Sequence, residues 1–137
     1  MAVIKELIRS EADGSLSFGN YALEQKAKVE DFEHCGDLYK VKTYREMTKL
    51  EKNGMFLYES VPGTGVLHFK EQEDSVEFVV EGSEDAQITL GMKDDTAYEI
   101  MMDGEIVGMV KTGLGGKLII SIELSEGKEI AVKVVQA

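Results

Sequence analysis

The chain has 137 residues, of which 43% are apolar, and this suits one globular domain or two small units that share a core. It carries 26 acidic and 15 basic residues, for a formal net charge of −11, and its only arginines are Arg9 and Arg45. A net negative surface poor in arginine repels polyanions, so we expect no binding to nucleic acid or to an anionic membrane.

The N-terminal segment and the single cysteine indicate the cellular compartment. Lys5 and Glu6 follow directly after the apolar start of MAVIKELIRS, so the segment lacks the long apolar stretch of a signal peptide. No run of the sequence approaches about 18 apolar residues, the length of a membrane span. One cysteine, Cys35, excludes an internal disulfide. We therefore expect a soluble cytoplasmic protein.

Short strand-like segments separated by turn residues fill the first part of the chain. Alternation is clearest at residues 38–44, where Tyr39, Val41 and Thr43 share one face, as in a half-buried strand. Asn53-Gly54 predicts a tight hairpin turn, and for this reason we favour strand over a short helix just before it. The expected strands are residues 2–9, 15–18, 28–34, 38–44, 47–52 and 55–59, with turns at Asp13-Gly14, Gly36-Asp37 and Asn53-Gly54.

The second part of the chain contains the strongest turn signals. Val61-Pro62-Gly63 is the best candidate boundary, because proline and glycine interrupt regular structure. Asp103-Gly104 predicts a hairpin, since a type I′ turn needs positive φ at both central residues. A second hairpin follows after the turn at residues 113–116. The expected strands are residues 66–71, 76–81, 87–90, 96–102, 105–111, 117–124 and 128–135.

These segments predict an all-β, antiparallel fold. Turn signals recur about every 8 to 12 residues and no long helical pattern is found, which is typical of a β-sandwich. We assign residues 63–137 to a C-terminal sandwich domain, Ig-like or jelly-roll-like, and residues 1–62 to an N-terminal β-sheet subdomain. This smaller sheet either packs on the sandwich or completes it, and in the second case the chain is one continuous domain.

No group of residues has the spacing of a known catalytic or metal-binding motif. His34 and Cys35 are adjacent, so in a regular strand they point to opposite faces and do not chelate one metal together. Nothing near His68 in the sequence makes it the base for a nucleophile. The acidic loops, which begin near Glu71 and Glu81, do not match an EF-hand. We therefore predict no catalytic residue, no metal and no other cofactor.

Tyrosine and methionine side chains supply the candidate binding surfaces. We expect most of the aromatic rings to fill the core, and Tyr39, Tyr44 and Tyr58 are the best candidates for contact with a glycan or a protein partner. Met101 and Met102 are adjacent in a predicted strand, so one faces the core and the other faces outwards. Methionine suits adaptable protein surfaces, so the outward residue predicts a homo-oligomer contact or a contact with the N-terminal sheet.

Several segments resemble a group of small, uncharacterised Firmicutes proteins that are often labelled endosialidase or endosialidase-like. The similarity is carried by IKELIRSEADGSLSFGNY, by GDLYKVKTYREMTKLEKNGMFLYESVPGTGV, and by EDAQITL with MDGEIVGMVKTGLGGKLIISIEL. The resemblance implies a free-standing all-β protein without an established activity. The C-terminal part is also similar, more loosely, to β-sandwich accessory modules of carbohydrate-active enzymes.

Three hypotheses for the function follow, in order of preference. The first is a non-enzymatic binding or assembly module that acts through protein contacts, with another protein or a second copy as its partner. The alternative is a carbohydrate-binding module that stacks a glycan on its tyrosines. The third is a small glycan hydrolase built on loop carboxylates. Sialidase activity that is lost on mutation of Arg9 or Arg45 would support this hypothesis.

Overall fold

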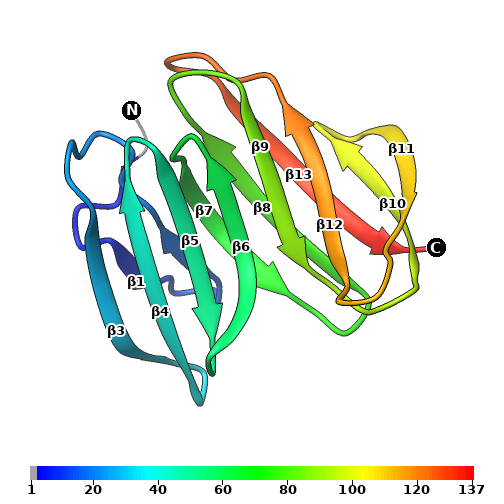
Figure 1. Cartoon of the computed structure of the whole chain (residues 1–137), viewed down its shortest axis with the longest axis horizontal. Helices are drawn as coiled ribbons and strands as arrows, with labels where there is room; N and C mark the ends of the chain where they lie inside the picture. The colour runs from blue at the N-terminus through cyan, green and yellow to red at the C-terminus, as the bar shows by residue number, and fades with distance from the viewer. Residues whose placement is uncertain (1–2) are drawn as a thin grey trace.

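The computed structural model describes residues 3–137, which form thirteen β-strands and no helix (Figure 1). Within these residues there is accordingly no helix long and apolar enough to cross a membrane. The strands are β1 (Ile8–Ser10), β2 (Leu16–Phe18), β3 (Ala27–His34), β4 (Asp37–Tyr44), β5 (Met47–Lys52), β6 (Met55–Val61), β7 (Gly65–Glu71), β8 (Ser75–Glu81), β9 (Ala86–Gly91), β10 (Ala97–Met102), β11 (Glu105–Lys111), β12 (Lys117–Ile122) and β13 (Glu129–Gln136).

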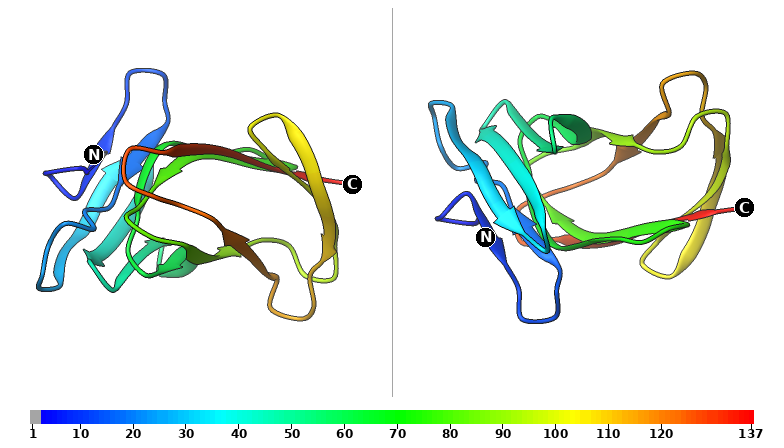
Figure 2. Two further views of the ribbon diagram at one scale, coloured as in Figure 1. Left: turned by 90° about the horizontal axis from the view of Figure 1, so that it is seen from above. Right: turned by 90° about the horizontal axis from the view of Figure 1, so that it is seen from below.

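The strands form two antiparallel sheets that pack face to face. The seven-stranded sheet has the order β1-β2-β7-β8-β13-β10-β11, and the six-stranded sheet has the order β12-β9-β6-β5-β4-β3. Figure 2 shows the two layers from above and below, with the β10–β11 hairpin at the end of the sandwich opposite β1–β3. The prediction of an all-β antiparallel sandwich is confirmed.

The strands that precede Pro62 join the two sheets of the sandwich. β1 and β2 extend the seven-stranded sheet next to β7, and β3 to β6 extend the six-stranded sheet next to β9. The chain crosses from one sheet to the other between β6 and β7, where Pro62 and Gly63 lie. Of the two arrangements expected for the N-terminal strands, the structure has the one in which they complete the sandwich.

Most segments expected to be strands form close to their predicted positions. β5 pairs with both β4 and β6, and Arg45 and Glu46 form the turn that precedes it, so this segment is a β-hairpin, as favoured over a helix. The Asn53-Gly54 and Asp103-Gly104 turns both have positive φ at their two residues, as a type I′ turn requires. The first strand is shorter than expected, because β1 begins only at Ile8, and Ala2 lies outside the described residues.

The turn expected at Gly36-Asp37 lies one residue earlier. Asp37 already belongs to β4 and pairs with His34 of β3, so Cys35 and Gly36 are the two central residues of the turn. Their φ angles are 50° and 84°, both in the left-handed region. Cys35 is therefore exposed at a hairpin tip.

Alternate residues of the strands point between the sheets and form the core. In β4 the burial alternates as predicted, with Tyr39, Val41 and Thr43 buried and the residues between them more exposed. The same alternation runs along β12 and β13, so the two sheets share one apolar interior. This interior extends from Ile8 on β1 to Val134 on β13.

A chain of buried hydroxyl groups runs through the end of the core near the β6–β7 crossover. The Oγ1 atoms of Thr43 and Thr48 are 2.8 Å apart, and the Thr48 hydroxyl donates to the carbonyl oxygen of Thr64 at 2.9 Å. The Tyr58 hydroxyl and Ser60 Oγ lie 2.7 and 2.8 Å from Thr64 Oγ1. These hydrogen bonds fasten the crossover to the six-stranded sheet.

Candidate functional site

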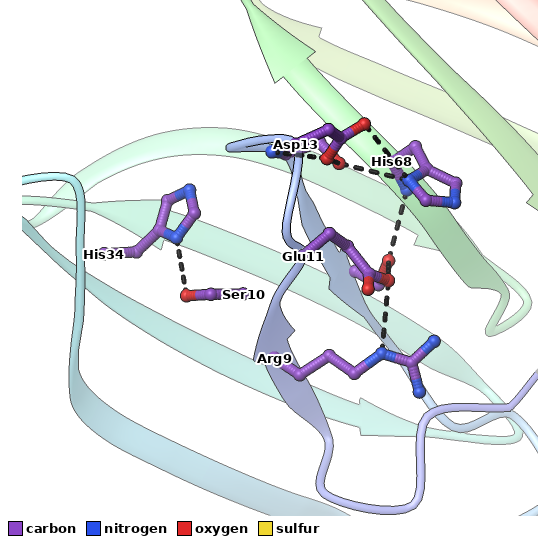
Figure 3. Close-up of polar contacts among 8 residues, drawn as sticks. Arg9, Ser10, Glu11, Asp13, His34 and His68 are labelled. Carbon is purple, nitrogen blue, oxygen red and sulfur yellow. Dashed lines mark hydrogen bonds and ion pairs between the residues drawn. The ribbon is translucent and has the colours of Figure 1, made fainter.

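A cluster of polar side chains lies on the β1–β2 hairpin beside His68 of β7 (Figure 3). In the turn of the hairpin, the backbone N–H and the hydroxyl of Ser15 both donate to Asp13 Oδ1, at 3.0 and 2.5 Å. These hydrogen bonds to the carboxylate lower the pKa of Asp13. The turn itself needs Gly14, whose φ is +86°.

His68 enters the cluster from an irregularity in β7. The β7–β8 register shifts between Leu67 and Lys70, and His68 adopts a φ of 54° there. Its backbone N–H donates to Ser17 Oγ at 3.2 Å, and its Nδ1 lies 3.1 Å from Ser15 Oγ and 3.7 Å from Asp13 Oδ2. The bulge therefore directs the imidazole towards the hairpin turn.

Serine, histidine and aspartate here do not form a catalytic triad. In a triad, the histidine accepts the serine proton on one nitrogen and is held by the aspartate through the other. Here Ser15 and Asp13 both approach the same nitrogen of His68, and the Ser15 hydroxyl donates its proton to Asp13. Ser15 is also only 1% exposed. The arrangement fixes the hairpin and does not activate a nucleophile.

Glu11 links the same hairpin to β1 and gives the fold a pH dependence. The Ser17 hydroxyl donates to Glu11 Oε2 at 2.5 Å and Arg9 Nε donates to the same oxygen at 3.1 Å. The Ser17 hydrogen bond, followed by Arg9, lowers the pKa of Glu11 below its usual range.

We expect Glu11→Gln to remove part of the acid sensitivity of the fold. Because the folded-state pKa is lowered, ionised Glu11 stabilises the fold above its unfolded pKa, and this contribution is lost as the pH falls through the folded value. The free energy of unfolding, measured by denaturant titration at a series of acidic pH values, should therefore fall less steeply in the variant. Glu84→Gln, in an exposed loop, is the control and should follow the parent curve.

His34 closes the sandwich between β3 and β1. Its Nε2 lies 3.1 Å from the carbonyl oxygen of Gly14, which only accepts, so Nε2 is the donor and Nδ1 accepts from the Ser10 hydroxyl at 2.6 Å. Cys35 Sγ lies 3.6 Å from the same ring, but across residues 3–137 no three histidine, cysteine or acidic side chains gather as metal ligands. His34 is a structural residue that joins the edges of the two sheets.

The three candidate tyrosines do not form a common surface. Tyr39 is 8% exposed and Tyr58 is 0% exposed, so both rings belong to the core and neither offers a stacking face to a glycan. Their positions alternate towards the interior in β4 and β6, which is why the expectation of surface contact is wrong for these two. Tyr44 is partly exposed, and the Lys26 ammonium lies 5.7 Å from its ring centroid.

Met101 and Met102 face opposite sides of β10, as the alternation of a strand requires. Met102 is opposite Val132 and packs against the core. Met101 is opposite Lys133 and lines a groove of about 360 Å³ on the outer face of the seven-stranded sheet, which reaches to His68. Met101 is the outward residue of the pair, and on the next strand it is opposite Ile106.

The most exposed apolar strand in the described residues is β11, at the edge of the seven-stranded sheet. Ile106, Val107 and Met109 are 64%, 54% and 61% exposed, whereas Val110 packs against the core. Among residues 3–137, β11 pairs with β10 alone, so its other side has no strand beside it. Single exposed apolar residues are common, but a run of them on an unpaired edge is a typical interaction surface. We call Ile106, Val107 and Met109, with Met101 beside them, the edge patch.

Sequence reasoning did not name Ile106, Val107 or Met109 as candidate surface residues, although it noted Met109 among the methionines around the Asp103-Gly104 hairpin. It assigned EIVGMVK to a hairpin strand without considering which faces its apolar residues occupy. Ile106 and Val107 are consecutive, as are Met109 and Val110, so apolar side chains fill both alternating positions. A strand with one buried face needs apolar residues at only one of them. Apolar residues at both alternating positions of this strand were the sequence signal that could have identified the edge patch.

Comparisons of the chain with family models, with curated proteins and with solved structures gave no match. The resemblance to the endosialidase-like group therefore stays a prediction from the quoted segments. The function has to be argued from the geometry of this chain alone.

Proposed function

We propose that the protein is a non-enzymatic assembly module that associates with itself through the edge patch. The observation that carries this proposal is the exposure of Ile106, Val107 and Met109 along an unpaired edge strand. Burial of such side chains between two copies removes apolar area from water, which drives most protein association.

The contrast between the two ends of the sandwich supports this choice of surface. At one end, the edge strands β1 and β3 are held together by the hydrogen bonds of His34 to Ser10 and Gly14. At the other end, no strand within residues 3–137 pairs with the outer side of β11. Natural proteins usually shield an exposed edge with charges, prolines or bulges. β11 has one bulge and a terminal Lys111, but its stretch from Ile106 to Val110 contains no charge and no proline, so this apolar edge favours a functional contact.

The proposal predicts self-association that depends on Met109. Light scattering coupled to size-exclusion chromatography, over a wide range of concentrations, should detect a dimer or larger species of the parent chain. Met109→Lys should weaken the association at least about tenfold, since it replaces a buried apolar side chain by a charge. Added salt should strengthen the association of the parent, because two copies with a net charge of −11 each repel one another and salt screens this repulsion.

Ile119→Lys is the matched control for Met109→Lys. Ile119 is 52% exposed on β12 of the other sheet, so the substitution removes a comparable exposed apolar side chain away from the edge patch. It should leave the association unchanged. A parent chain that stays monomeric at every concentration, or two lysine variants with the same effect, would contradict the proposal.

A further inference from the structure

We infer that the second copy adds to β11 edge to edge and antiparallel, with Ile106 of one copy opposite Met109 of the other. This inference rests on the proposed function and specifies its geometry. Two seven-stranded sheets would then continue into one another across a two-fold axis between the two β11 strands. The backbone and the apolar side chains of β11 both favour this register.

The backbone of β10 determines which groups of β11 point outwards. The Asp103 N–H donates to Ala131 and the Ala137 N–H donates to Ala97, so the odd-numbered residues of β10 bond to β13. The backbone N–H and C=O groups of successive residues in an antiparallel strand point to opposite neighbours. The even-numbered residues of β10 therefore bond to β11. Two of them, Tyr98 and Met102, are opposite Val110 and Glu105.

Three residues of β11 consequently direct their N–H and C=O groups away from the sheet. Ile106 and Met109 are two of them, and Lys111 is the third. A β-bulge at Val107, where the β10–β11 register shifts, makes the step from Ile106 to Met109 three residues long, whereas outward positions of a regular strand follow every second residue. A bulge usually disturbs pairing with a regular strand, but a second copy of β11 carries the same bulge.

Pairing Ile106 of one copy with Met109 of the other fits this unusual spacing in both strands, because the same pair forms twice across the two-fold axis. The symmetric contact pairs Met109 with the partner's Ile106, so the outward backbone groups at both positions find partners and the two bulges lie opposite each other. Two other antiparallel registers also set outward-facing residues opposite each other at two positions. They place Lys111 opposite Ile106 in one case and opposite Met109 in the other. Only the proposed register sets apolar side chains against apolar side chains.

Cysteine cross-linking tests the register directly. In a Cys35→Ser background, the Ile106→Cys, Met109→Cys double variant should form a covalent dimer in oxidised glutathione, because Cα atoms of a hydrogen-bonded antiparallel pair are about 5.5 Å apart, within disulfide range. Each single variant should remain uncross-linked under the same conditions, since in this register residue 106 is not opposite itself and neither is residue 109.

Dimerisation of the parent chain measured by light scattering, together with efficient cross-linking of either single cysteine variant or with no cross-linking of the double variant, would overturn this register and leave the proposed function intact. A monomeric parent chain would overturn both.

Discussion

Replacement of Tyr58 by alanine should lower the free energy of unfolding by about 4 kcal/mol, the largest loss expected for a single side chain in this protein. Tyr58 is 0% exposed. Its ring packs edge-on against those of Phe18, Phe69 and Phe78, with centroids 5.2, 6.3 and 5.7 Å away. The substitution leaves a large cavity between the two sheets, and close-packed neighbours relax into such a space only in part.

Tyr58→Phe separates the contribution of the ring from that of the hydroxyl. This variant keeps the aromatic contacts and removes only the hydrogen bond to Thr64 Oγ1, which measures 2.7 Å. We expect a loss of about 1 to 2 kcal/mol, since the buried Thr64 hydroxyl keeps Ser60 as a partner. Denaturant unfolding of the three proteins gives both values. Equal losses in the two variants would show that the ring contributes nothing and would contradict the packing argument.

Gly63→Ala should destabilise the protein by about 3 kcal/mol, because the added methyl group has no space. A Cβ atom at Gly63 would lie 2.0 Å from the carbonyl oxygen of Tyr44 and 3.3 Å from Cβ of Tyr21. The backbone cannot move aside without loss, since the Gly63 N–H donates to Arg45 O at 2.9 Å. The close approach holds the β6–β7 crossover against the β4–β5 turn.

Gly113→Ala is the matched control for this steric effect. A Cβ atom at Gly113 meets no heavy atom within 4 Å, and its φ is not in the left-handed region. The free energy of unfolding of this variant, measured in the same denaturant series, should stay within about 0.5 kcal/mol of the parent value. If both glycine variants lose the same stability, the effect comes from backbone entropy and not from the contact with Tyr44.

Stability and assembly are separable in this protein because they depend on different parts of the sandwich. Tyr58 and Gly63 act near the crossover between the sheets, whereas the edge patch lies on the outermost strand, β11. We therefore expect Met109→Lys to change association without a large change in the free energy of unfolding. This separation makes the association experiments interpretable.

The alternation and turn chemistry of the sequence predicted most of the strands. Tyr39, Val41 and Thr43 were expected on one face, and they are buried together because side chains of a strand alternate strictly between its faces. Asp103-Gly104 forms the expected hairpin because few residue pairs adopt positive φ at both positions. These are local properties of the chain, and a single sequence contains them.

The candidate site depended on properties that are not local. Tyr58 is a core ring rather than part of a binding surface because its face of β6 is turned inwards. The inward face of β6 is set only when the strand pairs with β5 and β9. The approach of His34 to Ser10, and of His68 to Ser15, joins segments far apart in the chain. The spacing of residues along the sequence does not reveal such long-range contacts.

By itself, the sequence determined an all-β antiparallel sandwich without a recognisable catalytic motif, because alternation and turn residues act over a few neighbouring positions. Only the tertiary structure decided that β11 ends its sheet, since edge position follows from the order β13-β10-β11 and not from the composition of the strand. In a central strand, the backbone groups on both sides of these residues would be paired. At an edge, with one side unpaired, Ile106, Val107 and Met109 become the surface on which the proposed assembly rests.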